Sequence, residues 1–215
     1  MRVLIFGDVH GNLIALEKML QVAGPEADMV ISHGDVVNYG PWSNECVQLL
    51  ESVECTCLMG NHETYYIEGS YPGENKVAKA FFSHCYPRFS QKELITAWGN
   101  AVEVGDFQVQ HTVNNQYVFP DTDIDELQLE RNYIIGHSHH QFAATSAEGK
   151  KLINTGSVGQ NRKWINVINY VLYDTISTEV SLESVVYNVD LVLDKMRQEG
   201  YPSICLEYYQ QKKRL

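Results

Sequence analysis

The chain has 215 residues and a formal net charge of −11, with 44% hydrophobic and 20% charged residues. These proportions exclude a disordered or fibrous chain and predict one globular domain over residues 1–215. The negative charge disfavours long nucleic acid as a partner, because like charges repel. It does not exclude a small phosphorylated substrate, since bound divalent cations reverse the sign of the field locally.

Cysteine usage and the absence of targeting signals favour an intracellular setting. The five cysteines are odd in number and form no CxxC pair, so we expect reduced, mostly buried thiols. The first apolar run is too short for a signal peptide or a membrane span. We therefore expect a cytoplasmic protein without a membrane partner. An apolar edge strand near the C-terminus would suit a dimer, so monomer and homodimer both remain open.

Strand and helix patterns alternate at the start of the chain. Val3–Phe6 is a continuous apolar run that predicts a buried strand, and Asn12 is expected to cap a helix that ends near Ala23. Two further apolar strands are predicted before Gly34 and Gly60, with a helix capped by Ser43 or Asn44 between them. This alternation predicts a βαβ sheet with both faces covered.

The rest of the chain mixes helices with strands. Helices are predicted at 73–86 and 90–98, the second with a capping box from Ser90 to Glu93. The segment from about residue 203 is predicted to be a polar, frayed tail. Strands are predicted at 101–104, 107–112, 133–135, 164–174 and 179–189, a hairpin turn at Glu148-Gly149, and a last helix at 190–200.

Side chains with metal-binding chemistry recur directly after the predicted strands. The carboxyl ends of parallel strands share one edge of a sheet, so these side chains should converge. We expect the i, i+2 pairs Asp8/His10 and His137/His139 to face one cleft, as they would in extended chain. Histidine, Asp and Asn without Cys suit Mn²⁺, Fe²⁺/Fe³⁺, Zn²⁺ or Ni²⁺. The set is Asp8, His10, Asp35, Asn61, His111, His137 and His139.

This set is too large for a single catalytic metal that must keep positions open for substrate. Two metals about 3.5–4 Å apart, bridged by one carboxylate, use the ligands economically. Asp35 is the natural bridge, because it is the only carboxylate of its loop.

Five motifs stand in the order found in the calcineurin-like metallophosphoesterases, a family that this chain resembles. Residues 154–162, NTGSVGQNR, also resemble a segment of the small bacterial phosphodiesterase branch. Each motif alone is a weak signal, but five in order are strong evidence. The motifs are Asp8-Val-His10, Gly34-Asp35 with Gly40, Gly60-Asn61-His62-Glu63, an isolated His111, and Gly136-His137-Ser-His139.

The resemblance implies a fold, a metal arrangement and a catalytic pair. The fold would be an α/β, four-layer α-β-β-α sandwich of two mixed sheets flanked by helices, in a single domain. His62 and the bridging Asp35 would be the catalytic residues. One metal would take Asp8, His10, Asp35 and His139, and the other Asp35, Asn61, His111 and His137.

Four further residues are candidates for support or substrate binding. Glu63 replaces an Asp that is common in the family and would orient His62, and Asn38 replaces a frequent Gly. Tyr39 would either stack on a substrate ring or pack on the surface. Arg162 would either bind a distal phosphate or remain solvated.

The resemblance implies a two-metal phosphoesterase that acts on a phosphodiester or phosphomonoester, of small nucleotide type. A metal-bridging hydroxide would attack phosphorus, and His62 would protonate the leaving group. A dinucleoside polyphosphate hydrolase is a variant of this class. A non-catalytic protein-binding scaffold is the alternative class, and the filled His62 position favours the enzyme. His33, His84 and His140 are expected outside the site.

Overall fold

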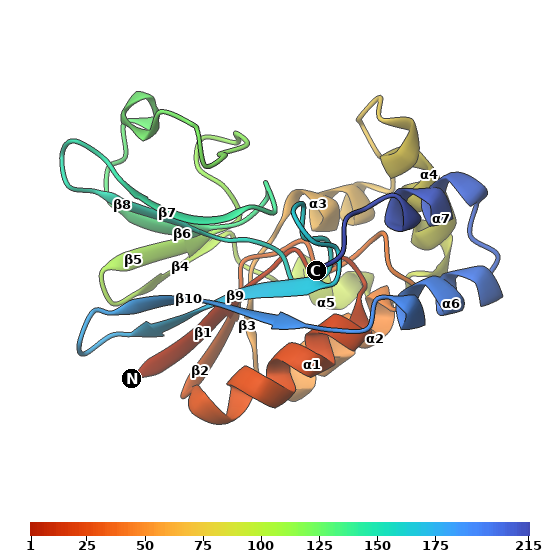
Figure 1. The fold of residues 1–215 in the computed structure, drawn as a ribbon, viewed down its shortest axis with the longest axis horizontal. Coiled ribbons are helices and arrows are strands. Elements are labelled where there is room, and N and C mark those ends of the chain that lie inside the picture. Colours follow the sequence, from red (N-terminus) through yellow and green to blue (C-terminus); the bar gives the residue numbers. More distant parts are fainter.

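Two five-stranded sheets pack against each other and form the centre of the molecule (Figure 1). The computed structural model describes residues 1–215. The strand orders are β10-β9-β1-β2-β3 and β4-β5-β6-β8-β7. Each sheet has three neighbouring parallel strands, β1-β2-β3 and β5-β6-β8, and its other pairings are antiparallel. The predicted fold class of two mixed sheets flanked by helices in one domain is confirmed.

The strands follow the predicted segments closely, including the hairpin that turns at Glu148-Gly149. No helix combines the length and the hydropathy that a membrane span requires. The strands are β1 (Arg2–Phe6), β2 (Met29–Ser32), β3 (Thr56–Cys57), β4 (Ala101–Val104), β5 (Phe107–Gln110), β6 (Asn132–Ile135), β7 (Gln141–Thr145), β8 (Lys151–Thr155), β9 (Val167–Asp174) and β10 (Val180–Val186). The helices are α1 (Leu13–Ala23), α2 (Ser43–Ser52), α3 (Asn61–Glu68), α4 (Lys76–Cys85), α5 (Lys92–Thr96), α6 (Asp190–Gln198) and α7 (Ser203–Gln210), with 3-10 helices η1 (Gly24–Glu26), η2 (Tyr86–Arg88) and η3 (Ile124–Leu127).

The apolar run of β1 divides its side chains between two cores. Successive side chains of a strand point to opposite faces. Val3 and Ile5 therefore join residues of the second sheet, such as Phe107, in the core between the sheets. Leu4 and Phe6 join the larger core under the helices. Burial on both faces explains why this strand is apolar at every position.

The outer face of the second sheet has a thinner cover than the first. Residues between Val113 and Leu129, including η3, pack onto Tyr133, Ile135 and Leu152. The acidic segment 121–131 thus supplies a single 3-10 turn, η3. Most of the helices lie instead at one end of the molecule, where α3 to α7 gather (Figure 1).

Helix starts are the least accurate part of the predicted fold. Asn12 caps α1 as predicted, since its side chain accepts a hydrogen bond from Ala15 N at 3.1 Å. Neither predicted cap of α2 forms: Ser43 lies inside the helix, where its hydroxyl accepts from Asn38 N at 3.0 Å. The box predicted at Ser90 is also wrong, because α5 begins without a side-chain cap.

The prediction of a frayed polar tail from about residue 203 is wrong. These residues form α7, which packs against α4. Tyr209 is fully buried, and its hydroxyl accepts from Gln160 Nε2 at 3.0 Å. After the helix, Ile165 N donates to Lys213 O at 2.9 Å. Only two residues of this short helix are buried, so its sequence shows no clear apolar periodicity.

Replacing Tyr209 by Ala should destabilise the protein by about 3–5 kcal/mol, because the change leaves a large cavity. The buried amide of Gln160 would also lose its hydroxyl partner. Urea unfolding measures the change. Ile176→Ala is the control, since Ile176 is 84% exposed and its truncation should have little effect. Equal stability of the two variants would show that α7 is not part of the folded core.

Candidate metal centre

The predicted polar residues converge where the carboxyl ends of parallel strands from both sheets meet. Six of the eight are buried, and Asn61 and His137 are partly exposed. Every predicted metal ligand and His62 are therefore brought to one place. Asp8 and His10 follow β1, Asp35 follows β2, Asn61 and His62 begin α3 after β3, His111 follows β5, and His137 and His139 follow β6.

The i, i+2 argument assumed extended chain, but the loops that carry these residues are not extended. Five of the residues have left-handed backbone, which costs roughly 1–2 kcal/mol for each non-glycine residue. Such strain persists only where the surrounding structure fixes it, and it clusters at functional sites. The φ angles are 49° for Asp8, 50° for His10, 55° for Asp35, 69° for His137 and 60° for His139.

Two glycines permit the close packing of these loops. A Cβ at Gly136 would lie 2.0 Å from the ring of His33 and 2.3 Å from Asp8 Oδ2. A Cβ at Gly60 would lie 2.2 Å from Asp35 Oδ1. Side chains at these positions would therefore push the metal-binding loops apart. His33 itself bonds to Thr155 Oγ1 at 2.7 Å, in agreement with its predicted place outside the ligand set.

Asp8, His10 and His139 form the first group of ligand atoms. His139 Nε2 lies 3.2 Å from both Asp8 Oδ1 and His10 Nε2. His10 Nε2 lies 3.9 Å from Asp8 Oδ1. All three side chains are at most 4% exposed, so the group is shielded from water.

Asp35, Asn61, His111 and His137 form the second group. His111 Nε2 lies 3.0 Å from both Asn61 Oδ1 and His137 Nδ1. It also lies 3.4 Å from Asp35 Oδ2. The same Asp35 oxygen lies 3.9 Å from His10 Nε2 in the first group. One carboxylate oxygen therefore stands between the two groups, where a bridging ligand is expected.

Backbone carbonyl groups fix the tautomers of three histidines. The Nδ1 atom of His10 faces Val37 O at 3.3 Å, that of His111 faces His33 O at 3.2 Å, and that of His139 faces Gln160 O at 2.9 Å. A carbonyl can only accept, so each Nδ1 carries the proton and donates. Whenever such a ring is neutral, its Nε2 is unprotonated and faces the centre, as in a metal ligand.

The arrangement leaves acceptor atoms facing acceptor atoms. Asp8 Oδ1 is buried and has no hydrogen-bond partner. Its nearest polar neighbours are the unprotonated nitrogens of His139 and His10. Buried acceptors are costly unless a donor or a cation satisfies them. The donor set and this unsatisfied oxygen therefore fit a metal ion held by the first group.

Charge interactions keep the buried carboxylate of Asp35 ionised. Burial alone would raise the pKa of Asp35, but His111 and His62 hold that pKa well below its usual range. Burial opposes the charge on His111, yet the Asp35 carboxylate raises the pKa of that ring to about 9. Burial and His111 lower the pKa of His137 to about 4. A metal at the second group would take the place of the proton on His111.

His62 does not bond to a backbone carbonyl through Nδ1, unlike His10, His111 and His139. Its Nδ1 atom lies 3.0 Å from the Asn38 amide nitrogen. The amide orientation is set by Tyr66, whose hydroxyl donates to Asn38 Oδ1 at 3.4 Å. His62 Nδ1 therefore accepts, and the neutral ring carries its proton on Nε2. Its ring nitrogen lies close to atoms of His10 and Asp35, but this tautomer suits a proton donor better than a ligand.

Glu63 does not orient His62 as expected. Its carboxylate is fully buried and accepts four backbone N–H bonds. These come from Asp35, Val36 and Val37 after β2, and from Gly60 before α3, at 2.7–3.1 Å. Glu63 therefore ties together the loops that carry Asp35 and His62. Asn38 performs the orienting role predicted for Glu63.

The remaining predicted residues lie beside the first group. Tyr39 is 8% exposed, and its ring lies 4.9 Å from the His10 ring and 5.3 Å from the His62 ring. It therefore packs within the site wall. Arg162 donates to the hydroxyl of Tyr208. His140 lies outside both groups, against Phe119, as predicted.

A cavity of about 730 Å³ opens beside the second group and was not predicted from the sequence. None of its lining residues is an acid, lysine or arginine. Gln108 and Gln110 alternate with buried Val109 in β5, so both can face the cavity, a pattern that was visible in the sequence. Apart from the predicted ligands Asn61, His111 and His137, nothing in the sequence pointed to the other lining residues. The amide and tyrosine side chains are Asn61, Asn100, Gln108, Gln110, Asn115, Tyr65 and Tyr117.

Comparison with known families decides the identity. Residues 1–152 match the family model described as calcineurin-like phosphoesterase. The chain belongs to the calcineurin-like phosphoesterase family. Members of this family depend on a dinuclear metal centre, so the chain is a metal-dependent phosphoesterase.

Similar proteins cover nearly the whole chain. An uncharacterized protein of Methanocaldococcus jannaschii is 27% identical over 92% of this chain and 93% of its own length. A metallophosphoesterase structure from Sphaerobacter thermophilus has 25% identity and a TM-score of 0.78, with 98% of both chains covered. A hypothetical protein from Pyrococcus horikoshii has a TM-score of 0.81 at 14% identity, with 97% of both chains covered, and shows the same fold.

Asp35→Asn should remove metal from both groups, whereas Asp8→Asn should remove it chiefly from the first. The reason is that Asp35 Oδ2 faces ligand nitrogens of both groups. Metal analysis of Mn²⁺-equilibrated protein should give about two ions per chain for the wild type. Asp106→Asn, an exposed change, is the control. Equal metal loss in the two site variants would refute the bridging position of Asp35.

Proposed function

We propose that this phosphoesterase hydrolyses a phosphodiester or phosphomonoester of small nucleotide type at a two-metal centre. One observation carries the proposal: Asp35 Oδ2 lies between two groups of histidine nitrogens, 3.9 Å from His10 Nε2 and 3.4 Å from His111 Nε2. The first metal would bind Asp8, His10, Asp35 and His139. The second would bind Asp35, Asn61, His111 and His137.

The ligand charges suit an anionic substrate. The seven ligands include only two carboxylates, so two divalent cations would leave a net positive centre in a chain of charge −11. When bound, the metals supply Lewis acidity toward phosphoryl oxygens and lower the pKa of water. The nitrogen and oxygen ligands without thiolate favour Mn²⁺ as the working metal for tests.

His62 is the group that we assign to the leaving oxygen. Its Nε2 carries a proton, and Asn38 keeps the ring in that tautomer. Burial lowers the pKa of free His62, and the nearby Asp35 partly offsets this effect. A bound phosphate anion would raise the pKa of His62 and favour the charged form of the ring, which is the proton donor. His62 would then donate its proton to the departing oxygen.

The neutral cavity beside the second group supports a nucleotide-type substrate. Amides present both donors and acceptors, and tyrosines present aromatic surface, without any fixed charge. An uncharged ring with hydrogen-bonding edges, such as a nucleobase, matches this lining. The phosphate would lie at the metals and the base in the cavity.

His62→Ala should lower kcat by about 10²–10⁴-fold for an alkyl or nucleoside ester, which needs a proton on the leaving oxygen. With p-nitrophenyl esters the loss should be smaller, because p-nitrophenolate leaves without a proton. Steady-state kinetics with Mn²⁺ on both substrate types measures the difference.

His84→Ala is the matched control for this variant, because His84 packs against Tyr201 away from the metal groups. It should retain wild-type rates on both substrates. An equal loss on both ester types in His62→Ala would argue against a role at the leaving group. No hydrolysis of any mono- or diester by the wild type would refute the proposed function.

Gln110→Leu should raise KM for a nucleoside phosphate about tenfold, because the apolar side chain cannot bond to the base. The size of the side chain is nearly unchanged. The ratio of kcat/KM for the nucleotide to that for methyl p-nitrophenyl phosphate should fall by the same factor. Gln198→Leu, at an exposed helix position, is the control. An unchanged ratio would place the base elsewhere.

A further inference from the structure

Two cationic side chains meet at one tyrosine next to the metal centre. The guanidinium of Arg162 donates to the hydroxyl of Tyr208. The ammonium of Lys212 lies 4.6 Å from the centre of the same ring. Both cations are only partly exposed. The C-terminal helix that the sequence did not predict therefore brings a second cation to Arg162.

Neither cation has a carboxylate partner. The ion pairs of the chain use five other basic residues, and Arg162 and Lys212 form none. Burial and, to a smaller extent, the charge of Arg162 lower the pKa of Lys212. Most of the 16 Lys and Arg residues also form no ion pair, but Arg162 and Lys212 are distinguished by meeting at one tyrosine ring, where an anion would offset their repulsion.

The position of the pair relative to the metals is fixed by a hydrogen-bonded loop. His139 Nδ1 donates to Gln160 O at 2.9 Å, and the Tyr208 hydroxyl donates to Gln160 Oε1 at 3.1 Å. Gln160 thus holds a metal-ligand histidine on one side and Tyr208 on the other. Arg162, two residues later, extends from the same loop.

Aromatic rings complete the path from the cation pair to the site. The Tyr208 ring lies 6.3 Å from the Tyr39 ring. Tyr39 in turn lies 4.9 Å from His10 and 5.3 Å from His62. The two cations therefore stand one tyrosine beyond the first metal group, on the side where His62 lies.

We propose that Arg162 and Lys212 form a binding site for a second anionic group of the substrate, such as a distal phosphate. This inference rests on the proposed function, because the first phosphate must lie at the metals. Guanidinium and ammonium groups are the usual protein partners of phosphate oxygens. The substrates selected would carry at least two linked anionic groups, with Tyr208 and Tyr39 as the surface between them.

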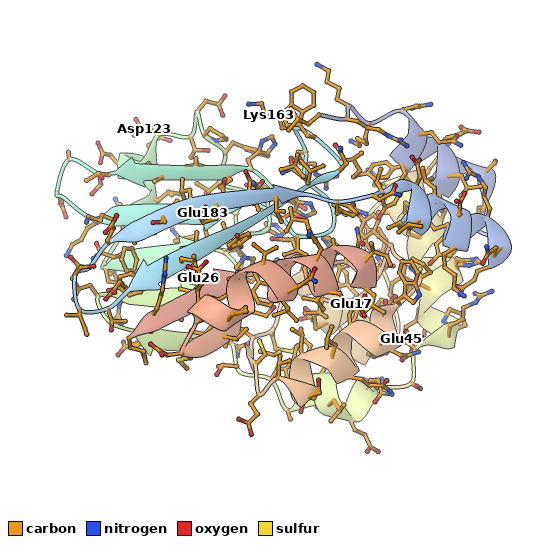
Figure 2. The ribbon with its side chains drawn as sticks, turned by 60° about the horizontal axis from the view of Figure 1, so that its bottom comes forward. Glu17, Glu26, Glu45, Asp123, Lys163 and Glu183 are labelled. Carbon is orange, nitrogen blue, oxygen red and sulfur yellow. The ribbon has the colours of Figure 1, made fainter.

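A simpler role for Lys212 is a favourable interaction with the carboxyl end of α7, which is worth about 0.3–1 kcal/mol for a cation in the last turn. Lys213 stands at the same helix end and would serve that purpose equally. It is exposed and forms no cation–π contact with Tyr208. Lys163, labelled in Figure 2, is likewise the exposed neighbour of Arg162. The two pairs of neighbours provide charge-matched controls.

Calorimetry on the Mn²⁺-loaded full chain tests the site without turnover. The probes are bis(methylene)triphosphate, a tripolyphosphate analogue that cannot be hydrolysed, and methylphosphonate, which has one anionic group. Arg162→Gln and Lys212→Gln should each weaken the triphosphate analogue about tenfold, as for the loss of one charge-assisted contact. The Kd of methylphosphonate should change less than twofold.

Lys163→Gln and Lys213→Gln remove the same charge and should leave both Kd values within twofold of the wild type. Equal weakening in all four variants would show a general field effect and overturn the site. Unchanged binding in Arg162→Gln and Lys212→Gln would overturn it as well. Arg162→Lys, which keeps the charge but loses the planar fork, should weaken the analogue less than Arg162→Gln. Because binding is measured directly, loss of the anion site is distinguishable from absence of hydrolysis.

Discussion

Acceptor atoms that face one another at the strand ends are the constraint on which the structure depends. The carboxylate of Asp8 and the unprotonated nitrogens of His10 and His139 approach within 3.2–3.9 Å with no donor between them. Backbone carbonyls on the far side of each ring enforce this arrangement. The left-handed loops and the glycines packed between them hold these acceptor atoms close together despite their mutual electrostatic repulsion. The fold thus spends stability to prepare a site for cations.

Most of the fold was predictable because its strands are either continuous apolar runs, such as β1, or alternate apolar with polar residues, such as β5, and end in recognisable loops. Val3–Phe6 is buried on both faces, which gives the continuous apolar run that the sequence shows. The metal ligands were predictable for a related reason, since they follow strands whose carboxyl ends meet. The i, i+2 argument correctly placed both members of each pair at one site, but its assumption of extended chain was wrong. His137 and His139 enter different groups through turns, and extended-chain parity does not describe them.

The features that escaped prediction depend on contacts between distant segments. Glu63 looked like a partner of His62, its neighbour in sequence, yet its oxygens bond to the loop after β2. Helix α7 looked like a tail because only Cys205 and Tyr209 are buried in it. The neutral cavity joins residues of α3, β4, β5 and four loops, so no local sequence pattern indicates it. Local sequence patterns predict where a ligand residue lies, but not which distant residues form hydrogen bonds that fix its position.

Glu63 has a consequence for how the centre comes apart. Its two oxygens accept from the backbone of residues 35–37 and of Gly60, and Asp35 Oδ1 accepts from His62 N at 2.8 Å. The loop after β2, which carries Asp35, and the start of α3, which carries His62, are therefore joined through one carboxylate. Loss of the Glu63 carboxylate would displace Asp35 and His62 together. The group of Asp8, His10 and His139 lies on the loops after β1 and β6, outside these bonds.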